Sequence, residues 1–583
     1  MRNNIFVCVC AAFVLAAGIE LKAQDLDPTV VVDRAYEGKL VEFSKPSLEM
    51  SVPDSVMRFD LDFDYSVFAN PYKGSYEFNP YLLSMKPDVA SEEAGRFYLR
   101  AGAGYQLHPE LDLVWSPVMG KTSESFSLDV YARHRSFIGK YNDITFIDGL
   151  ATSEKGRYWK GYDLDTKAGA IMEYDWKSGK LGMTAGYYGL HQKDQSWNRA
   201  YNAVDVSFDL SSKNQEYDSF VYGISADYRY AHDYTALTSS QERIIGGHDL
   251  SVDATIGSGL KKGGAFHLDF GMDLAGYKGY VEDVAAGLYV TPKYLYRKGV
   301  LSAELGLKVQ AVVGDTTTFV RRARQQFVYP DIAVRLNLLP KYLALFVNAG
   351  GGAKVESYSS LLQKNRHINI AVPAMTTSDP EDDIFGYRMG ATVERVALSA
   401  GLEGRFGSRF SYVLSGGYTN YAAGLLDALR VVEYNHDGSP KVLAGVEYMP
   451  YQKVYASVQW LWKSENFAAD GKVAYADAFG KAFTDRSSCL LPSALTGDVA
   501  FEYNYSRRIF AGVDCAFATA RTIGSGYVTI PGYADLGLSL EYVTSRNLSV
   551  WARVGNLLGM TVQRTPLYAE SGVYFTAGIC LNL

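Results

Sequence analysis

The sequence from residue 96 to residue 583 alternates apolar and polar residues in run after run. In one run the apolar residues are Phe266, Leu268, Phe270, Met272 and Leu274, and between them stand His267, Asp269, Gly271 and Asp273. Successive side chains of a β-strand point to opposite faces, so one face of this strand is apolar and the other is polar. The pattern predicts about 22 such strands, each about ten residues long.

The links between the runs alternate in length. Short links are predicted at Lys177–Lys180, Lys213–Glu216, Lys261–Gly264, Arg297–Val300, Pro340, Gly407–Arg409, Pro450–Gln452, Ser506–Arg508 and Thr544–Asn547. Long links are predicted at Phe137–Tyr162, Glu356–Val393 and Lys463–Ala494. Short periplasmic turns and long extracellular loops are typical of outer-membrane barrels. We therefore predict an all-β chain whose residues 96–583 form a transmembrane antiparallel β-barrel.

Energy decides which face of the strands meets lipid. A Lys or Arg at the bilayer midplane costs roughly 2–4 kcal/mol in a barrel, so the charged stripes are expected to face the lumen. The lumen-lining candidates are Asp129, Arg133, Arg135, Lys167, Glu173, Asp227, Arg229, Glu304, Lys308, Arg335, Glu403 and Arg405. Two interpretations of these charges are open. The favoured one is that they pair between neighbouring strands and keep the lumen hydrated, and the other is that they set solute selectivity.

Closure of the barrel is a physical requirement. In hydrocarbon every backbone donor and acceptor needs a protein partner, and a closed sheet has no unpaired edge. The first strand, at Arg96–Tyr105, is therefore expected to pair with the last, at Val573–Leu583. An even number of strands would place both ends of the barrel on the periplasmic side.

The composition of the chain argues against several other classes of protein. After residue 23 no apolar run reaches 18 residues, which argues against membrane-spanning helices. The net charge of -7 and the lack of a long basic run argue against nucleic acid as a partner. After residue 23 the cysteines are Cys489, Cys515 and Cys580, and an odd number argues against a disulfide framework. Cys515 and Cys580 are expected to be small lipid-facing residues.

The N-terminal region differs from the rest. Residues 1–23 have the features of a cleaved signal peptide: Arg2 at the start, an apolar core from Ile5 to Ile19, and Ala23 before the predicted cut. Export and barrel patterning together predict the outer membrane of a Gram-negative cell. Residues 24–95 carry six of the 18 prolines and little alternation. We interpret them as a periplasmic extension that occludes the pore or binds a partner.

The C-terminal residues resemble a known family. Asn556-Leu557 follows the penultimate predicted strand, and Gly572-Val573-Tyr574-Phe575-Thr576-Ala577-Gly578 opens the last one. This resembles the final hairpin of TonB-dependent receptor barrels, and the resemblance implies a 22-stranded barrel that acts in solute uptake. The chain ends in Leu583, where that family usually has an aromatic residue.

A second departure from the family concerns its plug domain. Residues 24–95 are too few for that domain and show no plug pattern, so a plugless relative is predicted. Thr29, Val30, Val31 and Val32 resemble the short stretch that pairs with TonB, although a plain extended segment is the better interpretation of them. The sequence leaves the involvement of TonB open.

No motif of catalysis or cofactor binding stands out. His232-Asp233 and His436-Asp437 are predicted in outer loops, but residues adjacent in the chain do not form a hydrogen-bonded dyad. Asp379-Pro380-Glu381-Asp382-Asp383 has carboxylates but no calcium-loop spacing. Gly350-Gly351-Gly352 lacks the phosphate-loop spacing. We predict a protein that is not an enzyme and needs no metal or cofactor.

Two functions fit these observations. The first is solute transport across the outer membrane, with the lumen narrowed by residues 24–95, by the loop Glu356–Val393 or by a partner protein. The second is a non-conducting structural or assembly subunit of an outer-membrane complex. The expected partners are outer-membrane lipid and a periplasmic or surface-exposed lipoprotein.

Overall fold

The computed structural model describes residues 96–583 with several gaps. The described ranges are 96–105, 107–118, 125–147, 149–194, 197–213, 220–237, 242–260, 263–279, 283–314, 328–367, 389–434, 440–484, 488–524, 526 and 528–583. Four of the sequence predictions concern residues outside these ranges. They are the signal peptide at 1–23, the extension at 24–95 that includes Thr29–Val32, the His436-Asp437 pair, and the acidic group at 379–383.

Most of the described chain forms β-strands. In chain order these are β1 (Phe97–Gly104), β2 (Glu110–Val118), β3 (Ser125–Ile147), β4 (Leu150–Asp175), β5 (Gly179–Lys193), β6 (Trp197–Ser212), β7 (Phe220–Leu237), β8 (Glu242–Leu260), β9 (Gly264–Gly279), β10 (Asp283–Lys298), β11 (Leu301–Gly314), β12 (Val328–Leu339), β13 (Leu343–Glu356), β14 (Gly390–Phe406), β15 (Phe410–Tyr434), β16 (Pro440–Lys463), β17 (Phe467–Phe479), β18 (Leu495–Tyr505), β19 (Ile509–Ala518), β20 (Arg521–Thr522), β21 (Thr529–Ile530), β22 (Tyr533–Ser545), β23 (Leu548–Gly555) and β24 (Tyr574–Asn582). The described helices are α4 (Tyr358–Lys364) and the 3-10 helix η1 (Lys481–Phe483).

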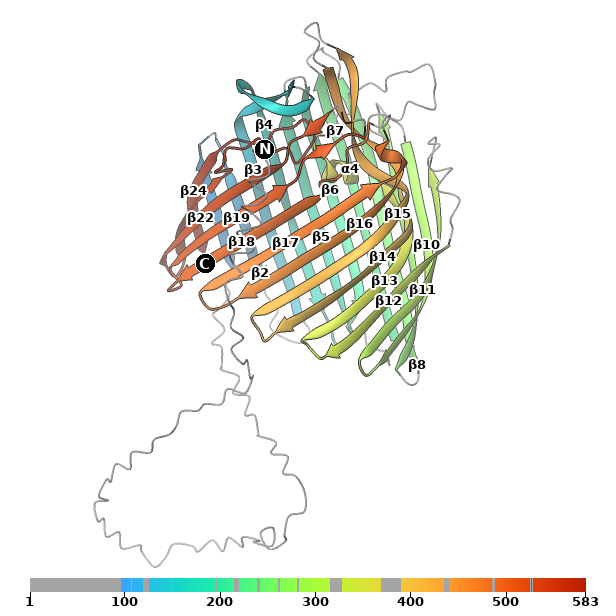
Figure 1. The fold of residues 1–583 in the computed structure, drawn as a ribbon. Coiled ribbons are helices and arrows are strands. Elements are labelled where there is room, and N and C mark those ends of the chain that lie inside the picture. The colour runs from blue at the N-terminus through green and yellow to red at the C-terminus, as the bar shows by residue number, and fades with distance from the viewer. Residues whose placement is uncertain are drawn as a thin grey trace, which may run out of the picture. The chain divides into compact units, whose positions relative to one another are not determined.

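The strands form one closed ring (Figure 1). From β1 to β19 each strand pairs with the next one along the chain, and β19 then pairs with β22. β24 returns to pair antiparallel with β1, with Tyr98 opposite Asn582 and Gly104 opposite Thr576. The two-residue strands β20 and β21 lie outside the ring, so the described chain forms a 22-stranded antiparallel barrel. The predicted fold class, strand number and pairing of first and last strands are confirmed.

The two backbones of the closing seam approach closely at small residues. A side chain at Gly104 would overlap the carbonyl group of Phe575, and one at Gly578 would overlap the carbonyl oxygen of Ala101. On the inner face of the seam, the Arg100 guanidinium lies over the Trp551 ring at 4.2 Å. The seam is therefore packed as closely as the interior of a sheet.

One face of the strands carries the predicted apolar belt. Phe126, Val204, Ile224, Ile256, Val458 and Phe575 are each 41–51% exposed in the isolated chain. They belong to strands that are spread around the ring. Water-soluble proteins do not tolerate a continuous apolar surface of this extent, whereas a transmembrane barrel presents one to lipid.

The short turns gather at one end of the barrel, together with the start of β1 and the end of β24. Most predicted short links are confirmed there, and Lys213–Glu216 lies largely outside the described residues. The link predicted at Pro450–Gln452 is wrong, because these residues lie within β16. The register with β15 shifts between Tyr421 and Gly424, opposite Pro450. A bulge accommodates a proline because it removes the need for a ladder hydrogen bond.

Two predicted long links are also corrected. Lys463–Ala494 contains β17, which follows β16 after a short turn at residues 464–466. Phe137–Tyr162 is not a loop, because β3 continues to Ile147 and β4 begins at Leu150. β4 has 26 residues, far more than the roughly ten that cross a membrane. The β3–β4 hairpin therefore extends well beyond the apolar belt at the end opposite the short turns.

Candidate functional site

The chain that follows β13 turns into the barrel interior, where α4 lies (Figure 1). We call residues 357–367 the inner segment. The Ser357 side chain caps the helix by accepting a hydrogen bond from the Ser360 backbone N–H at 3.2 Å. Lys364 Nζ lies 2.5 Å from Glu356 Oε1 and ties the end of the helix to its start. Tyr358, Leu361 and Leu362 are buried.

The inner segment is anchored by a buried ion pair on the far wall. Arg199 on β6 and Asp233 on β7 are both fully buried, and Arg199 Nε lies 3.2 Å from Asp233 Oδ2. The Tyr358 hydroxyl donates a hydrogen bond to the same carboxylate. β13 pairs with β12 and β14, so a contact with β7 crosses the barrel interior. Burial raises the pKa of Tyr358 well above its ordinary value, so the hydroxyl stays protonated and donates.

A second set of anchors follows Tyr358. Ser359 Oγ lies 2.9 Å from the Tyr201 hydroxyl and 2.8 Å from the Tyr277 hydroxyl. Ser357 Oγ donates to Asp249 Oδ2 at 3.1 Å. These partners lie on β6, β8 and β9. Together with Asp233 on β7, they hold the helix against the four consecutive strands β6 to β9.

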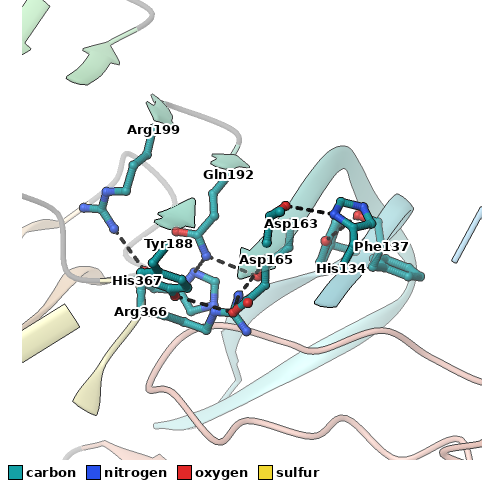
Figure 2. Close-up of polar contacts among 11 residues, drawn as sticks. His134, Phe137, Asp163, Asp165, Tyr188, Gln192, Arg199, Arg366 and His367 are labelled. Carbon is teal, nitrogen blue, oxygen red and sulfur yellow. Dashed lines mark hydrogen bonds and ion pairs between the residues drawn. The ribbon is translucent and has the colours of Figure 1, made fainter. Parts of the chain in front are cut away.

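The end of the inner segment carries a charged contact (Figure 2). Arg366 Nη2 lies 2.8 Å from Asp163 Oδ1 and 3.4 Å from Asp165 Oδ2, both on β4. Arg199 Nη1 donates to the Arg366 carbonyl oxygen at 3.0 Å. Burial opposes the charge of Arg366, but the two carboxylates outweigh this effect and raise its pKa. Arg366 therefore binds the end of the inner segment to β4 through these two ion pairs.

His367 is packed between β5 and the connection from β23 to β24. Its ring stacks on Tyr568 with 3.4 Å between ring centroids. Gln192 Nε2 lies 3.4 Å from its Nδ1, and Figure 2 labels both residues. Burial lowers the pKa of His367 well below its ordinary value of 6.5, and the nearby Arg366 and Arg199 charges lower it further. His367 is therefore neutral in the packed segment at neutral pH.

We expect acidification to loosen the inner segment. Below pH 6.5 a released His367 binds a proton, whereas the packed ring does not, so the packed state loses stability as the pH falls. Each pH unit costs at most about 1.4 kcal/mol until the lowered pKa is reached. The intrinsic exchange rate of an amide itself falls as the pH falls, so the comparison uses exchange rates corrected for this dependence. The corrected exchange of residues 357–367 should be faster at pH 5 than at pH 7.5, by up to roughly 30-fold.

The control for this effect is His367→Phe, which keeps a ring against Tyr568 but cannot bind a proton. The carboxyl groups of Asp163, Asp165 and Glu570 also lie near Arg366, and they remain in the variant. An equal change in exchange rate in both proteins would show that His367 is not the titrating group.

A cavity of about 800 Å³ lies between the inner segment and the wall from β3 to β9. Three of the predicted lumen residues line it: Lys167, Asp227 and Arg229. Arg229 pairs with Asp205, and Lys167 Nζ lies 5.2 Å from the Tyr188 ring centroid. The cavity is also lined by Asp249, Ser251, Asp273 and Arg366. Such a mixture of charged, hydroxyl and aromatic groups fits a polar solute.

The structure places the other lumen candidates on the same polar stripes but away from this cavity. Arg135 Nη2 lies 2.5 Å from Asp112 Oδ2, Arg133 Nε lies 3.9 Å from Asp112 Oδ1, and Glu173 pairs with Lys180 at 3.0 Å. Arg335 pairs with Glu403. Lys308 lines a second cavity of about 410 Å³ together with Lys354 and Glu394. Asp129, Glu304 and Arg405 lie on β3, β11 and β14.

Two further predictions are corrected by the strand alternation. His232 and Asp233 lie within β7 rather than in a loop, and Asp233 faces inward to Arg199, so the neighbouring His232 faces outward. Cys515 lies opposite Leu536 on the apolar face, as predicted. Cys580 lies opposite Ser549, on the stripe that includes the buried Trp551, so it faces the lumen rather than lipid.

The end opposite the short turns carries an apolar cap. Ala151, Leu429, Leu490, Ile523, Val528 and Ile530 form one buried cluster. They come from β4, β15, the β17–β18 connection and the β19–β22 connection. Gln563 Nε2 donates to the Ala151 carbonyl oxygen at 2.8 Å, and Thr529 on β21 pairs with Leu150. Connections between strands that are far apart on the ring therefore contact each other at this end of the barrel.

Within the described ranges, no helix has the length and apolar character needed to cross a bilayer. The same residues contain no group of three or more His, Cys, Asp or Glu side chains arranged to hold a metal ion.

The fold is shared with receptors and transporters of known structure. The iron transporter FrpB of Neisseria meningitidis has a TM-score of 0.57 at 9% identity, covering 84% of this chain and 82% of that one. The ferric enterobactin receptor of Pseudomonas aeruginosa, solved with enterobactin, has a TM-score of 0.56 at 12% identity, covering 84% and 81%. The copper transporter OprC has a TM-score of 0.54 at 12% identity, covering 84% and 80%.

No protein-family model matches the sequence. No curated protein matches it either. The similarity is therefore one of fold. It confirms the barrel architecture that the C-terminal resemblance to TonB-dependent receptors implied.

Proposed function

We propose that this protein takes up a polar solute across the outer membrane, and that the inner segment closes its lumen. The observation that carries the proposal is the position of the inner segment. It leaves β13, crosses the interior and is fixed to the opposite wall by Asp233, Asp163 and Asp165. A polar cavity lies directly beneath it.

The nature of the contacts favours a gate over a permanent wall. Leu361 and Leu362 pack in a buried apolar cluster, but the end of the segment is held by Arg366, which is part-exposed and lines the cavity. Polar ligands and water can replace such a charged contact, whereas a permanent barrier needs only apolar packing. The solved proteins that share the fold include transporters for iron and copper and a receptor for ferric enterobactin, which supports an uptake role. TonB and a lipoprotein remain proposed partners, because the segment assigned to them, Thr29–Val32, lies outside the described residues.

The proposal predicts an ion current through the barrel whose path runs along the cavity at the β3–β9 wall. Full-length protein in a planar bilayer should be closed for most of the time and open briefly. During openings, a small charged thiol reagent should reduce the current of an Asp227→Cys variant by half or more, because residue 227 lines the cavity. A Cys580→Ser background removes the native thiol that faces the lumen.

The matched control is Phe126→Cys in the same background, because Phe126 belongs to the apolar belt and is 41% exposed on the lipid side. Its current should not change. A block of both variants, or of neither, would contradict a solute path along the β3–β9 wall. A complete lack of current would favour the structural or assembly role.

A further inference from the structure

The second cavity, of about 410 Å³, lies among β11, β13, β14, β15, β16 and the last residue of α4. Three lysines line it: Lys308, Lys354 and Lys364. The carboxylates among its lining residues are Glu356 and Glu394. The partners that these charged groups already have decide what the cavity can bind.

Both carboxylates are already bound within the protein. Glu356 is 1% exposed, and its Oε1 accepts hydrogen bonds from Lys364 Nζ at 2.5 Å and from Thr392 Oγ1 at 3.0 Å. Glu394 accepts a hydrogen bond from the Tyr421 hydroxyl. Glu356 and Lys364 therefore neutralise each other, and the remaining two lysines give the cavity an excess of positive charge over Glu394.

Lys308 and Lys354 form no ion pair with a residue of the described ranges. The Lys308 side chain is half-buried, and its ammonium lies 4.3 Å from the centroid of the Tyr289 ring. The carboxylates around it on neighbouring strands bind other side chains: Asp253 binds Tyr289, Asp273 binds Ser251 and Asp331 binds Lys293. Lys354 is exposed. A partly buried charge without an ionic partner costs free energy, which a bound anion would recover.

A bulge in β13 shapes the wall of the cavity beside Lys308. The register with β14 shifts between Gly350 and Gly352, and Gly352 has a φ of 151°. The Cβ of a side chain at Gly352 would lie 3.4 Å from Lys308 Nζ. Gln310 on β11 holds the bulged strand in place, because its Oε1 accepts a hydrogen bond from the Ala353 N–H at 2.8 Å. Glycine therefore leaves the Lys308 ammonium open to the cavity.

The first cavity, of about 800 Å³, has the opposite balance of charge. Its acidic lining residues are Asp165, Asp205, Asp227, Asp249 and Asp273, and its basic ones are Lys167, Arg229 and Arg366. An anion is therefore expected to bind in the second cavity rather than in the first.

We propose that the second cavity binds an anionic group of the solute, a carboxylate or a phosphate, with Lys308 and Lys354 as its ligands. The proposal rests on the uptake role under Proposed function and adds the chemical class of the solute. Each ammonium group offers three donors, and charge-assisted hydrogen bonds to an oxyanion are among the stronger ones in proteins. A cavity of about 410 Å³ holds such a group together with part of the molecule that carries it.

The test is a titration of inorganic phosphate with the full chain in detergent at constant ionic strength, followed by the broadening of the phosphorus NMR signal. The wild-type protein should give saturable broadening. Lys308→Met and Lys354→Gln should each weaken binding about tenfold or more, because each removes charge-assisted hydrogen bonds. The matched control is Lys472→Gln, which changes an exposed lysine of β17 that lines neither cavity and should leave the affinity unchanged.

Two further arms identify the ligand. Succinate should displace phosphate, and uncharged succinamide should not. The anion that binds more tightly identifies the group that the solute carries. Equal affinity of the wild-type protein and both lysine variants, or displacement by succinamide, would overturn the proposal.

The binding test is independent of the conductance test, because it needs no current. A failure of lysine-dependent binding would leave the transport proposal intact. A lysine-dependent phosphate site in a protein that carries no current would keep the anion site and contradict transport.

Discussion

Replacing Asp233 by alanine should turn a mostly closed barrel into a mostly open one. The change removes the carboxylate that pairs with the buried Arg199 guanidinium and that accepts the hydrogen bond of the Tyr358 hydroxyl. Loss of one partner of a buried ion pair costs about 3–5 kcal/mol. Because the inner segment is held by this pair, most of that cost is expected to fall on its packed state. The open fraction should rise by roughly 100-fold or more.

The measurement is single-channel current of the reconstituted full chain, together with hydrogen exchange of residues 357–367. Asp227→Ala is the matched control, since it removes a carboxylate from the same strand at an exposed position. It should change the open fraction by less than twofold. Retention of heat-modifiable mobility would show that both variants still form the barrel. An Asp233→Ala protein that stays closed, with residues 357–367 still protected, would contradict the assigned role of the inner segment.

The barrel was predictable because its two surroundings impose the same local rule on every strand. Lipid outside and water inside require opposite side-chain character at successive residues, as at Phe266 to Leu274, so a pattern of period two is visible in the sequence alone. The seam was predictable for a different reason: an open sheet edge cannot exist in hydrocarbon.

The errors have physical causes. Proline and its neighbours usually mark a turn, yet Pro450 lies at a bulge inside β16, where no ladder hydrogen bond is required of it. The sequence predicts a loop where the β3–β4 hairpin continues, because the upper part of the hairpin lies beyond the hydrocarbon and its outer stripe need not be apolar. Lys140 and Lys160 stand there. Strand continuation above the membrane therefore has no hydrophobic signature.

The candidate site was predictable only in part. The lumen charges Lys167, Asp227 and Arg229 follow from the alternation, and the loop Glu356–Val393 was among the segments expected to narrow the lumen. Its anchors were not predictable, because Tyr358 and Asp233 are 125 residues apart and Arg366 and Asp163 are 203 apart. No local pattern records a contact between residues so distant. A buried Arg199 on a polar stripe looks like any lumen charge.

The claim on which the account depends is that β1 and β24 close the ring in the register described. Arg100 lies directly opposite the native Cys580. Phe97 and Leu583 form a hydrogen-bonded pair, because each donates its backbone N–H to the carbonyl oxygen of the other. Bonded and non-bonded pairs alternate along an antiparallel ladder, so Arg100 and Cys580, three positions along, form a non-hydrogen-bonded pair with Cα atoms about 4.5 Å apart. This separation suits a disulfide.

The direct measurement is disulfide formation in an Arg100→Cys variant of the membrane-inserted protein, detected by mass spectrometry after mild oxidation. The account predicts nearly complete linkage of residues 100 and 580. Leu99→Cys faces away from Cys580 and should not link, and neither should Arg100→Cys with Cys580→Ser. A properly inserted protein in which Arg100→Cys does not link to Cys580, or in which Leu99→Cys links instead, would contradict the closed ring.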